Sequence, residues 1–156
     1  MIELSIPGRG IIILRHAVFD VNGTLAVDGV LIEGVAERMQ KLGTHLELHL
    51  LTADTHGGQA TIDRQLGLTA RRIQPGGERE QKAAYVNNLG AESVVAVGNG
   101  ANDVGMLEAA AIGIVVMGTE GLNSEALQAA DIVVASIHDA LDLLLKPKRL
   151  IATLRR

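Results

Sequence analysis

The sequence is short of several residue types, and each shortage excludes a kind of chemistry. Its 156 residues include no cysteine and no tryptophan, and Phe19 and Tyr85 are the only phenylalanine and tyrosine. A chain without cysteine has no disulfide, no thiolate metal site and no thiol nucleophile. With so few aromatic rings, binding of single-stranded nucleic acid by base stacking is not expected.

Long apolar runs and strong charge are also missing. No stretch reaches the roughly 18 uncharged residues that a membrane-spanning helix needs. The opening segment MIELSIPGRG, with its early Glu3, does not have the pattern of a signal peptide. The net charge is −4 and only the segment 146–156 is basic, so we predict no nucleic-acid partner. We therefore expect a cytoplasmic protein that does not insert into membranes.

Apolar material, by contrast, is plentiful. Hydrophobic residues make up 47% of the chain, and Ala, Leu, Ile and Val dominate them. That is enough to build a sizeable core. The length fits one domain spanning residues 1–156, with no repeat and no linker.

Strand-like and helix-like segments alternate along the chain. The predicted strands are 2–6, 11–21, 45–52, 70–75, 93–100, 112–117 and 131–135, and the predicted helices are 33–42, 55–67, 78–90, 102–110, 121–130, 136–145 and 147–156. The PGRG turn joins the first two strands into an N-terminal β-hairpin, and Asp28-Gly29 indicates a second, smaller hairpin. The alternation predicts an α/β fold, with a doubly wound, Rossmann-like parallel sheet and helices on both faces.

Polar side chains stand where several predicted strands end. Asp20 follows one apolar strand, Thr52 ends another, and Asn99 and Asp103 follow a third. Parallel strands bring such positions to one edge of the sheet, where ligands bind in folds of this kind. A carboxylate there can attack phosphorus and form an aspartyl phosphate. The reaction needs a cation and fixed hydrogen-bond donors, which Thr52, Lys82 and an oxygen-bound Mg²⁺ would supply.

These residues fall in four motifs that resemble those of the haloacid dehalogenase (HAD) superfamily of phosphotransferases. The motifs are DVNGT at 20–24, LLTAD at 50–54, Lys82, and GNGANDVGML at 98–107. They follow the family order and cover roughly residues 11 to 135. More narrowly, the chain is similar to small soluble proteins related to the phosphorylation domain of P-type ATPases, in which the second acid of the first motif is also missing.

The resemblance implies a role for each matching position. Asp20, Asn22, Thr52 and Lys82 would be the catalytic positions, with Asp20 as the nucleophile. Gly23, Thr24, Ala53 and Asn102 would bind substrate, and Asp20, Asn22, Asn99 and Asp103 would hold Mg²⁺, with Asn22 acting through its backbone carbonyl. The gaps between the motifs leave no room for a cap domain.

Two asparagines depart from the family pattern. Asn22 stands where hydrolytic members have a general acid and base, and an amide cannot act as either near neutral pH. A phosphoenzyme should therefore break down slowly, because general acid–base help is worth about 10²–10⁴-fold. Asn99 replaces a metal-binding acid and should weaken Mg²⁺ affinity. Two carboxylates, Asp20 and Asp103, would remain.

Other interpretations stay open at this stage. Thr52 could cap a helix, Lys82 could be a solvated helix residue, and the asparagines could be turn residues. Asp54 and His56 could line the mouth of the site. Along the strand 45–52, His45, Glu47 and His49 alternate on one face, but their spacing of about 7 Å argues against a metal site and favours a partly exposed region or an interface.

The leading hypothesis is a slow, Mg²⁺-dependent HAD-type phosphohydrolase or phosphotransferase. Its substrate would be a phosphorylated small molecule or a phosphoprotein. The alternative is a catalytically degenerate module that binds phosphate, a metabolite or a protein, including a soluble partner of a cation-transporting ATPase. The capless plan and the apolar segment LDLLL at 141–145 make self-association, as a homo-oligomer, an expectation.

Overall fold

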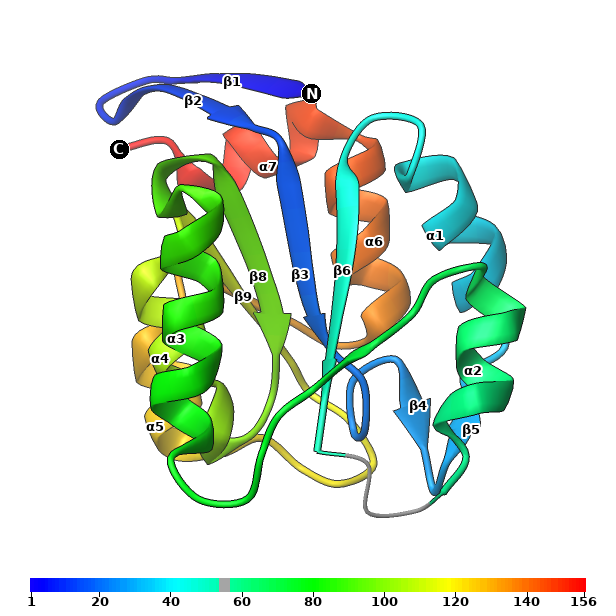
Figure 1. The fold of residues 1–156 in the computed structure, drawn as a ribbon. Coiled ribbons are helices and arrows are strands. Elements are labelled where there is room, and N and C mark those ends of the chain that lie inside the picture. Colours follow the sequence, from blue (N-terminus) through cyan, green and yellow to red (C-terminus); the bar gives the residue numbers. More distant parts are fainter. Residues whose placement is uncertain (54–56) are drawn as a thin grey trace.

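A parallel β-sheet forms the centre of the molecule (Figure 1). The computed structural model describes residues 1–53 and 57–156. Within them the sheet has the strand order β10–β9–β8–β3–β6–β7. The bounds are β3 (His16–Asp20), β6 (Glu47–Thr52), β7 (Arg71–Arg72), β8 (Val94–Gly98), β9 (Ile112–Val116) and β10 (Ile132–Val134). The predicted doubly wound sheet is confirmed, and its order reverses between β3 and β8, where folds of this type bind ligands.

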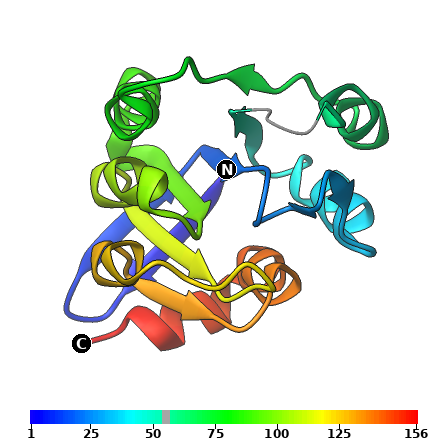
Figure 2. The ribbon, with the colours of Figure 1, turned by 90° about the horizontal axis from the view of Figure 1, so that it is seen from below.

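Helices cover both faces of the sheet, as Figure 2 shows along the strands. One face carries α1 (Val35–Leu42), α2 (Gln59–Leu66) and α6 (Ile137–Leu145), and the other carries α3 (Glu78–Leu89), α4 (Val104–Ala109) and α5 (Ser124–Ala129), with short 3₁₀ turns at Ala91–Ser93 and Ala101–Asp103. Every residue of β8 and β9 is buried. This burial explains their nearly continuous apolar sequences, because a sheet covered on both faces has no solvent side.

The N-terminal hairpin lies outside the main sheet. Strands β1 (Ile2–Ile6) and β2 (Gly10–Leu14) pair with each other, and β1 contacts α7 (Pro147–Leu154). The prediction of one continuous strand over 11–21 was wrong. The chain breaks at Arg15, whose backbone N–H donates to Ser93 and whose carbonyl accepts from Glu47, and β3 then enters the central sheet.

The hairpin and α7 are joined by apolar contacts and one terminal hydrogen bond. Alternate residues of β1 are buried, as are Leu150 and Leu154 of α7. The Arg156 N–H donates to the carbonyl of Pro7 over 2.9 Å. The hairpin therefore closes one end of the core rather than extending the sheet.

The second hairpin and the connections between motifs follow the prediction closely. Strands β4 (Ala26–Val27) and β5 (Val30–Leu31) are joined by Asp28 and Gly29, which have φ of 51° and 77°. Positive φ at both positions is what a type I′ turn requires. In the described part of the chain, this hairpin and α1 fill the interval between Asp20 and Thr52, and no cap domain is inserted there.

Several predicted bounds needed correction. The strand expected over 70–75 is only Arg71–Arg72, and the helix expected from 102 begins as a 3₁₀ turn at Ala101. Helix α6 buries Leu141 and Leu144 in the core, whereas Leu143 and Leu145 of the apolar segment 141–145 are only partly buried. None of the helices in the described residues combines the length and apolar character that crossing a bilayer requires.

Candidate active site

The predicted site residues meet at the carboxyl ends of β3, β6 and β8. Asp20 is the last residue of β3 and Thr52 the last of β6, and Asn99 follows β8 directly. All three side chains are at least nine-tenths buried. The three residues lie together as predicted, because β6 and β8 are both parallel neighbours of β3.

Lys82 joins the two acids of the site. Lys82 lies on helix α3. Its Nζ donates to Asp20 Oδ1 over 2.8 Å and to Asp103 Oδ1 over 2.7 Å. The Lys82 and Asp103 residues have no solvent exposure. A buried lysine of this kind needs charged partners, since an unpaired ammonium would shed its proton. The interpretation of Lys82 as a solvated helix residue is thus wrong.

Electrostatics at this centre favour a protonated Asp20 over two ionised carboxylates. Burial, and then the neighbouring Asp103, raises the pKa of Asp20 to about 7, although Lys82 opposes the shift. Burial also disfavours the charged form of Lys82, but the two carboxylates outweigh it and raise the pKa of Lys82. The ammonium therefore stays charged, and Asp20 loses its proton near neutral pH in the absence of a further cation.

Asp103 also organises the loop after β8. Its Oδ2 accepts hydrogen bonds from the backbone N–H groups of Asn99 and Gly100, each over 3.0 Å. A Cβ on Gly98 would lie 2.6 Å from Asp103 Cγ, so only glycine fits there. Gly98 and Asp103 of the segment GNGAND are therefore needed for the structure of this loop, apart from any role in the chemistry.

The turn after β3 places polar groups around Asp20. Gly23 has a φ of 79°, which glycine adopts without strain. The buried Thr24 hydroxyl lies 3.3 Å from Asp20 Oδ2 and 3.3 Å from Asn99 Oδ1, and its single proton serves one of them at a time. Asn22 Nδ2 donates to Thr52 Oγ1 over 3.4 Å.

Asn99 fastens two loops together. Its Nδ2 donates to the carbonyl of Gly23 over 3.0 Å and to that of Gly121 over 3.4 Å. Its amide oxygen faces the Thr24 hydroxyl. An amide suits this position, whereas a carboxylate would turn an acceptor towards two carbonyl oxygens.

The donor atoms fit a hard cation such as Mg²⁺. Asp20 and Asp103 supply carboxylate oxygens, and each can accept more than the bonds it already makes. The backbone carbonyl of Asn22 would be a third oxygen ligand. An oxygen-only set is what Mg²⁺ prefers, with water filling the remaining positions. Asn99 is the weakest member of the predicted metal set because its amide is already engaged.

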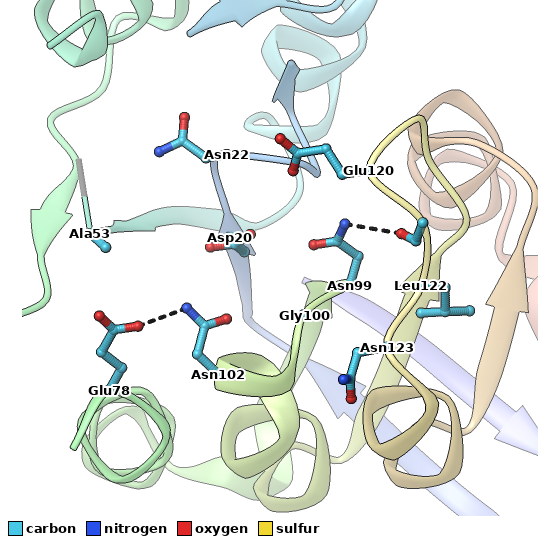
Figure 3. Close-up of a pocket in the computed structure, with 11 residues that line it drawn as sticks. Asp20, Asn22, Ala53, Glu78, Asn99, Gly100, Asn102, Glu120, Leu122 and Asn123 are labelled. Carbon is cyan, nitrogen blue, oxygen red and sulfur yellow. Dashed lines mark hydrogen bonds between the residues drawn. The ribbon is translucent and has the colours of Figure 1, made fainter. Parts of the chain in front are cut away.

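A polar cavity of about 660 Å³ opens above Asp20 (Figure 3). Its lining consists of Asp20, Asn22, Ala53, Glu78, Asn99, Gly100, Asn102, Glu120, Gly121, Leu122 and Asn123. Of the predicted substrate-binding residues, Ala53 and Asn102 line it. Gly23 and Thr24 line an adjacent, more apolar cavity of about 400 Å³. The predicted positions at Asp54 and His56 lie outside the described residues.

Two acids on the cavity wall were not anticipated from the sequence. Glu78 accepts from Asn102 Nδ2 over 2.9 Å. Glu120 lies in the loop after β9, and its Oε2 would be 2.1 Å from a Cβ on Gly23. Glu120 could have been expected near the site, because the loop after β9 leaves the same edge of the sheet as the loops after β3 and β8.

Comparison with known proteins gives relatives of two kinds. No protein-family model matches the chain. It is 44% identical over 88 residues to an uncharacterized protein of Methanocaldococcus jannaschii, which covers 54% of this chain and 95% of that one. It is 27% identical over 139 residues to a soluble P-type ATPase-like phosphatase of the same organism, covering 87% of this chain and 50% of that protein. The chain thus spans half the length of that phosphatase.

A solved structure agrees with the whole fold. The 3-deoxy-D-manno-octulosonate 8-phosphate phosphatase of Moraxella catarrhalis, crystallised with magnesium, phosphate and its sugar acid, superposes with a TM-score of 0.64 at 19% identity. The match covers 91% of this chain and 94% of that one. At this identity the likeness establishes a shared fold.

Proposed function

Because the chain belongs to the haloacid dehalogenase superfamily, we propose that residues 1–156 form one capless catalytic domain that transfers phosphoryl groups through Asp20. The observation that carries the proposal is the buried Lys82 ammonium held between Asp20 and Asp103 beneath an open polar cavity. A nucleophile, a fixed cation and space for an anion are the parts that phosphoryl transfer requires.

In the first step a carboxylate oxygen of Asp20 attacks phosphorus. The bond from phosphorus to the leaving oxygen breaks, and that oxygen departs with the electron pair and takes a proton from solvent. In the second step water attacks phosphorus, the acyl–phosphate bond breaks, and phosphate leaves with the Asp20 carboxylate restored. Lys82 and Thr52 supply positive charge and a hydroxyl donor to the phosphoryl oxygens throughout.

Bound Mg²⁺ would neutralise the phosphoryl charge as this group transfers. Asp20, Asp103 and the carbonyl of Asn22 would hold it, with Asn99 as a weak or indirect contributor. Because binding a dication favours the ionised carboxylate, the same residues would then present Asp20 as a nucleophile below pH 7.

Substrates with good leaving groups suit this site best. Asn22 has no acidic proton to give the leaving oxygen, and its Nδ2 donates a hydrogen bond to Thr52. Acyl and aryl phosphates need little protonation, whereas alkyl phosphates depend on it. The uncapped cavity admits a phosphorylated small molecule or a loop of a phosphoprotein, which we propose the protein encounters in the cytoplasm.

A second candidate function is phosphate or metabolite binding without turnover. Asn99 favours it, since its amide is committed to the carbonyls of Gly23 and Gly121, and Asp20 and Asp103 are the only carboxylates of the predicted metal set. In this case Asp20 would contact the ligand without forming a covalent bond to it.

Turnover of acetyl phosphate and para-nitrophenyl phosphate in Mg²⁺ separates the two functions. An enzyme should lose all turnover in Asp20→Ala, and a beryllofluoride soak should show density bonded to Asp20. Asp131→Ala, which removes an acid paired with Arg9 far from the cavity, serves as the control. Wild-type rates equal to those of Asp20→Ala, together with phosphate binding, would favour the binding module.

A further inference from the structure

Three metal-ligating side chains gather at the opposite end of β3 and β6 from Asp20. His16 begins β3 and Glu47 begins β6, and the two residues are register partners. His49 is two residues further along β6. We call His16, Glu47 and His49 the histidine cluster. His16 and Asp20 are separated by four residue steps, so their Cα atoms lie roughly 13 Å apart.

The ligand atoms of the histidine cluster converge on a common point. His16 Nδ1 lies 3.1 Å from His49 Nε2. Carboxylate oxygens of Glu47 lie 3.6 Å from His16 Nδ1 and 3.7 Å from His49 Nε2. Tetrahedral zinc, with bonds of about 2.0–2.1 Å, holds its nitrogen and oxygen ligands roughly 3.3 Å apart. The three separations are therefore close to those of a zinc site before any rearrangement.

The backbone and a fourth side chain hold this arrangement. Both imidazoles stand on adjacent parallel strands in the middle of the sheet, which fixes their Cα atoms. His49 Nδ1 lies 2.9 Å from the Tyr85 hydroxyl of α3. A ligating histidine usually hydrogen-bonds through its other ring nitrogen in this way, which orients the ring and fixes its tautomer.

Access and protonation also suit a metal. The His49 side chain is 9% exposed and that of His16 is 18%, whereas Glu47 is 69% exposed. Burial lowers the pKa of His49 and keeps its imidazole neutral, as a ligand must be. An ion can thus enter past Glu47, and water can occupy a fourth position. Metal binding would replace the hydrogen bond between the two rings, and the ring that now donates would carry its N–H on its other nitrogen.

We propose that the histidine cluster binds a zinc-class transition-metal dication, such as Zn²⁺ or Co²⁺, independently of the phosphoryl-transfer site. Imidazole nitrogens select such ions, whereas the oxygen ligands around Asp20 select Mg²⁺. The bound ion would tie β3 to β6 and, through Tyr85, to α3. No step of the proposed phosphoryl transfer depends on this ion.

The experiment titrates metal-free protein with Zn²⁺ in excess Mg²⁺, which occupies the carboxylate site. Calorimetry should show one equivalent bound, and Co²⁺ should give the intense visible bands of a low-coordinate site. His49→Gln and Glu47→Gln should each weaken binding at least 10-fold. Tyr85→Phe, which keeps the ligands but loses the hydrogen bond, should weaken it about 10-fold.

Controls separate this site from its surroundings. His45→Gln removes an exposed histidine just before β6 and should leave Zn²⁺ affinity unchanged. Asp103→Asn should also leave it unchanged, because that acid lies in the other site. Glu47 is on the surface, so its variant remains informative even if His49→Gln unfolds. The proposal is overturned if wild-type protein binds no Zn²⁺, or if Glu47→Gln and His49→Gln bind Zn²⁺ as tightly as the wild type does.

Discussion

The two ends of strand β3 present different kinds of polar chemistry. At Asp20, two buried carboxylates share one lysine ammonium, and every charge has a partner inside the protein. At His16, imidazole rings and one exposed carboxylate face each other with room for solvent. Only Ala17, Val18 and Phe19 separate the two ends, and all three are fully buried. In the two sites that we propose, a single central strand would serve two ions of different character, because each end emerges from the core beside different neighbours.

The largest effect that tests this comparison should come from Lys82→Met. The change leaves two buried acids without their cation, so phosphatase activity should vanish and unfolding free energy at pH 8 should fall by about 3 kcal/mol. Urea denaturation measures the second quantity. Lys41→Met, which breaks an exposed pair with Glu37, should change the unfolding free energy far less. If Lys82→Met also lowered the affinity for Zn²⁺, the two ends of β3 would not be independent.

The next largest effect is expected for Asn22→Asp. A carboxylate at this position can activate water, so the phosphoenzyme should break down on the order of 10²-fold faster. Labelling the enzyme with radioactive acetyl phosphate and chasing with unlabelled substrate measures this rate. Asn22→Ala, which adds no acid, should leave the lifetime nearly unchanged. Equal lifetimes in Asn22→Asp and wild type would remove the proposed role of Asn22.

The parts that could be predicted from the sequence depend on local pattern. Parallel strands, their polar ends and the turn at Asp28-Gly29 each leave a periodic or compositional signal, and the structure confirms them. Lys82 was identified only through its motif, since nothing in the helix 78–90 marks it as buried. The break at Arg15 was missed because apolar residues continue on both sides of it.

The histidine cluster shows why some sites cannot be recognised from a single segment of the sequence. Along β6, Glu47 and His49 are about 7 Å apart at their Cα atoms, which argued against a shared ion. The third partner, His16, comes from the adjacent strand, and the register that aligns it with Glu47 exists only after folding. His45, which the sequence grouped with them, precedes the strand.

A smaller effect should appear in the pH dependence of metal-free protein. The pKa of Asp20 is about 7 when folded against an ordinary value of 3.8, so the folded state holds the extra proton between these values. Stability should therefore fall as pH rises from 4 to 7 and level off above. Asp20→Asn should remove this slope in thermal melts with chelator, while Asp28→Asn, in an exposed turn, should keep it. If stability still falls between pH 4 and 7 in Asp20→Asn, another group is responsible for the slope.

The smallest effect should come from Asn99→Asp. The new carboxylate should tighten Mg²⁺ binding several-fold by calorimetry. It should also cost about 1–2 kcal/mol of stability without metal, because it faces the carbonyls of Gly23 and Gly121. Asn123→Asp adds the same charge to the same cavity but keeps its helix-capping bonds, so it should do neither. Unchanged Mg²⁺ affinity in Asn99→Asp would place residue 99 outside the metal set.

The contact between the first hairpin and helix α7 affects how this end of the protein unfolds. Residues 2–14 and 147–156 hold each other through buried Leu4 and Leu150 and through the bond from Arg156 to Pro7. Neither segment can peel away without uncovering the apolar side of the other. Their amide protons should therefore exchange with deuterium as one cooperative unit, rather than fraying separately from two loose ends.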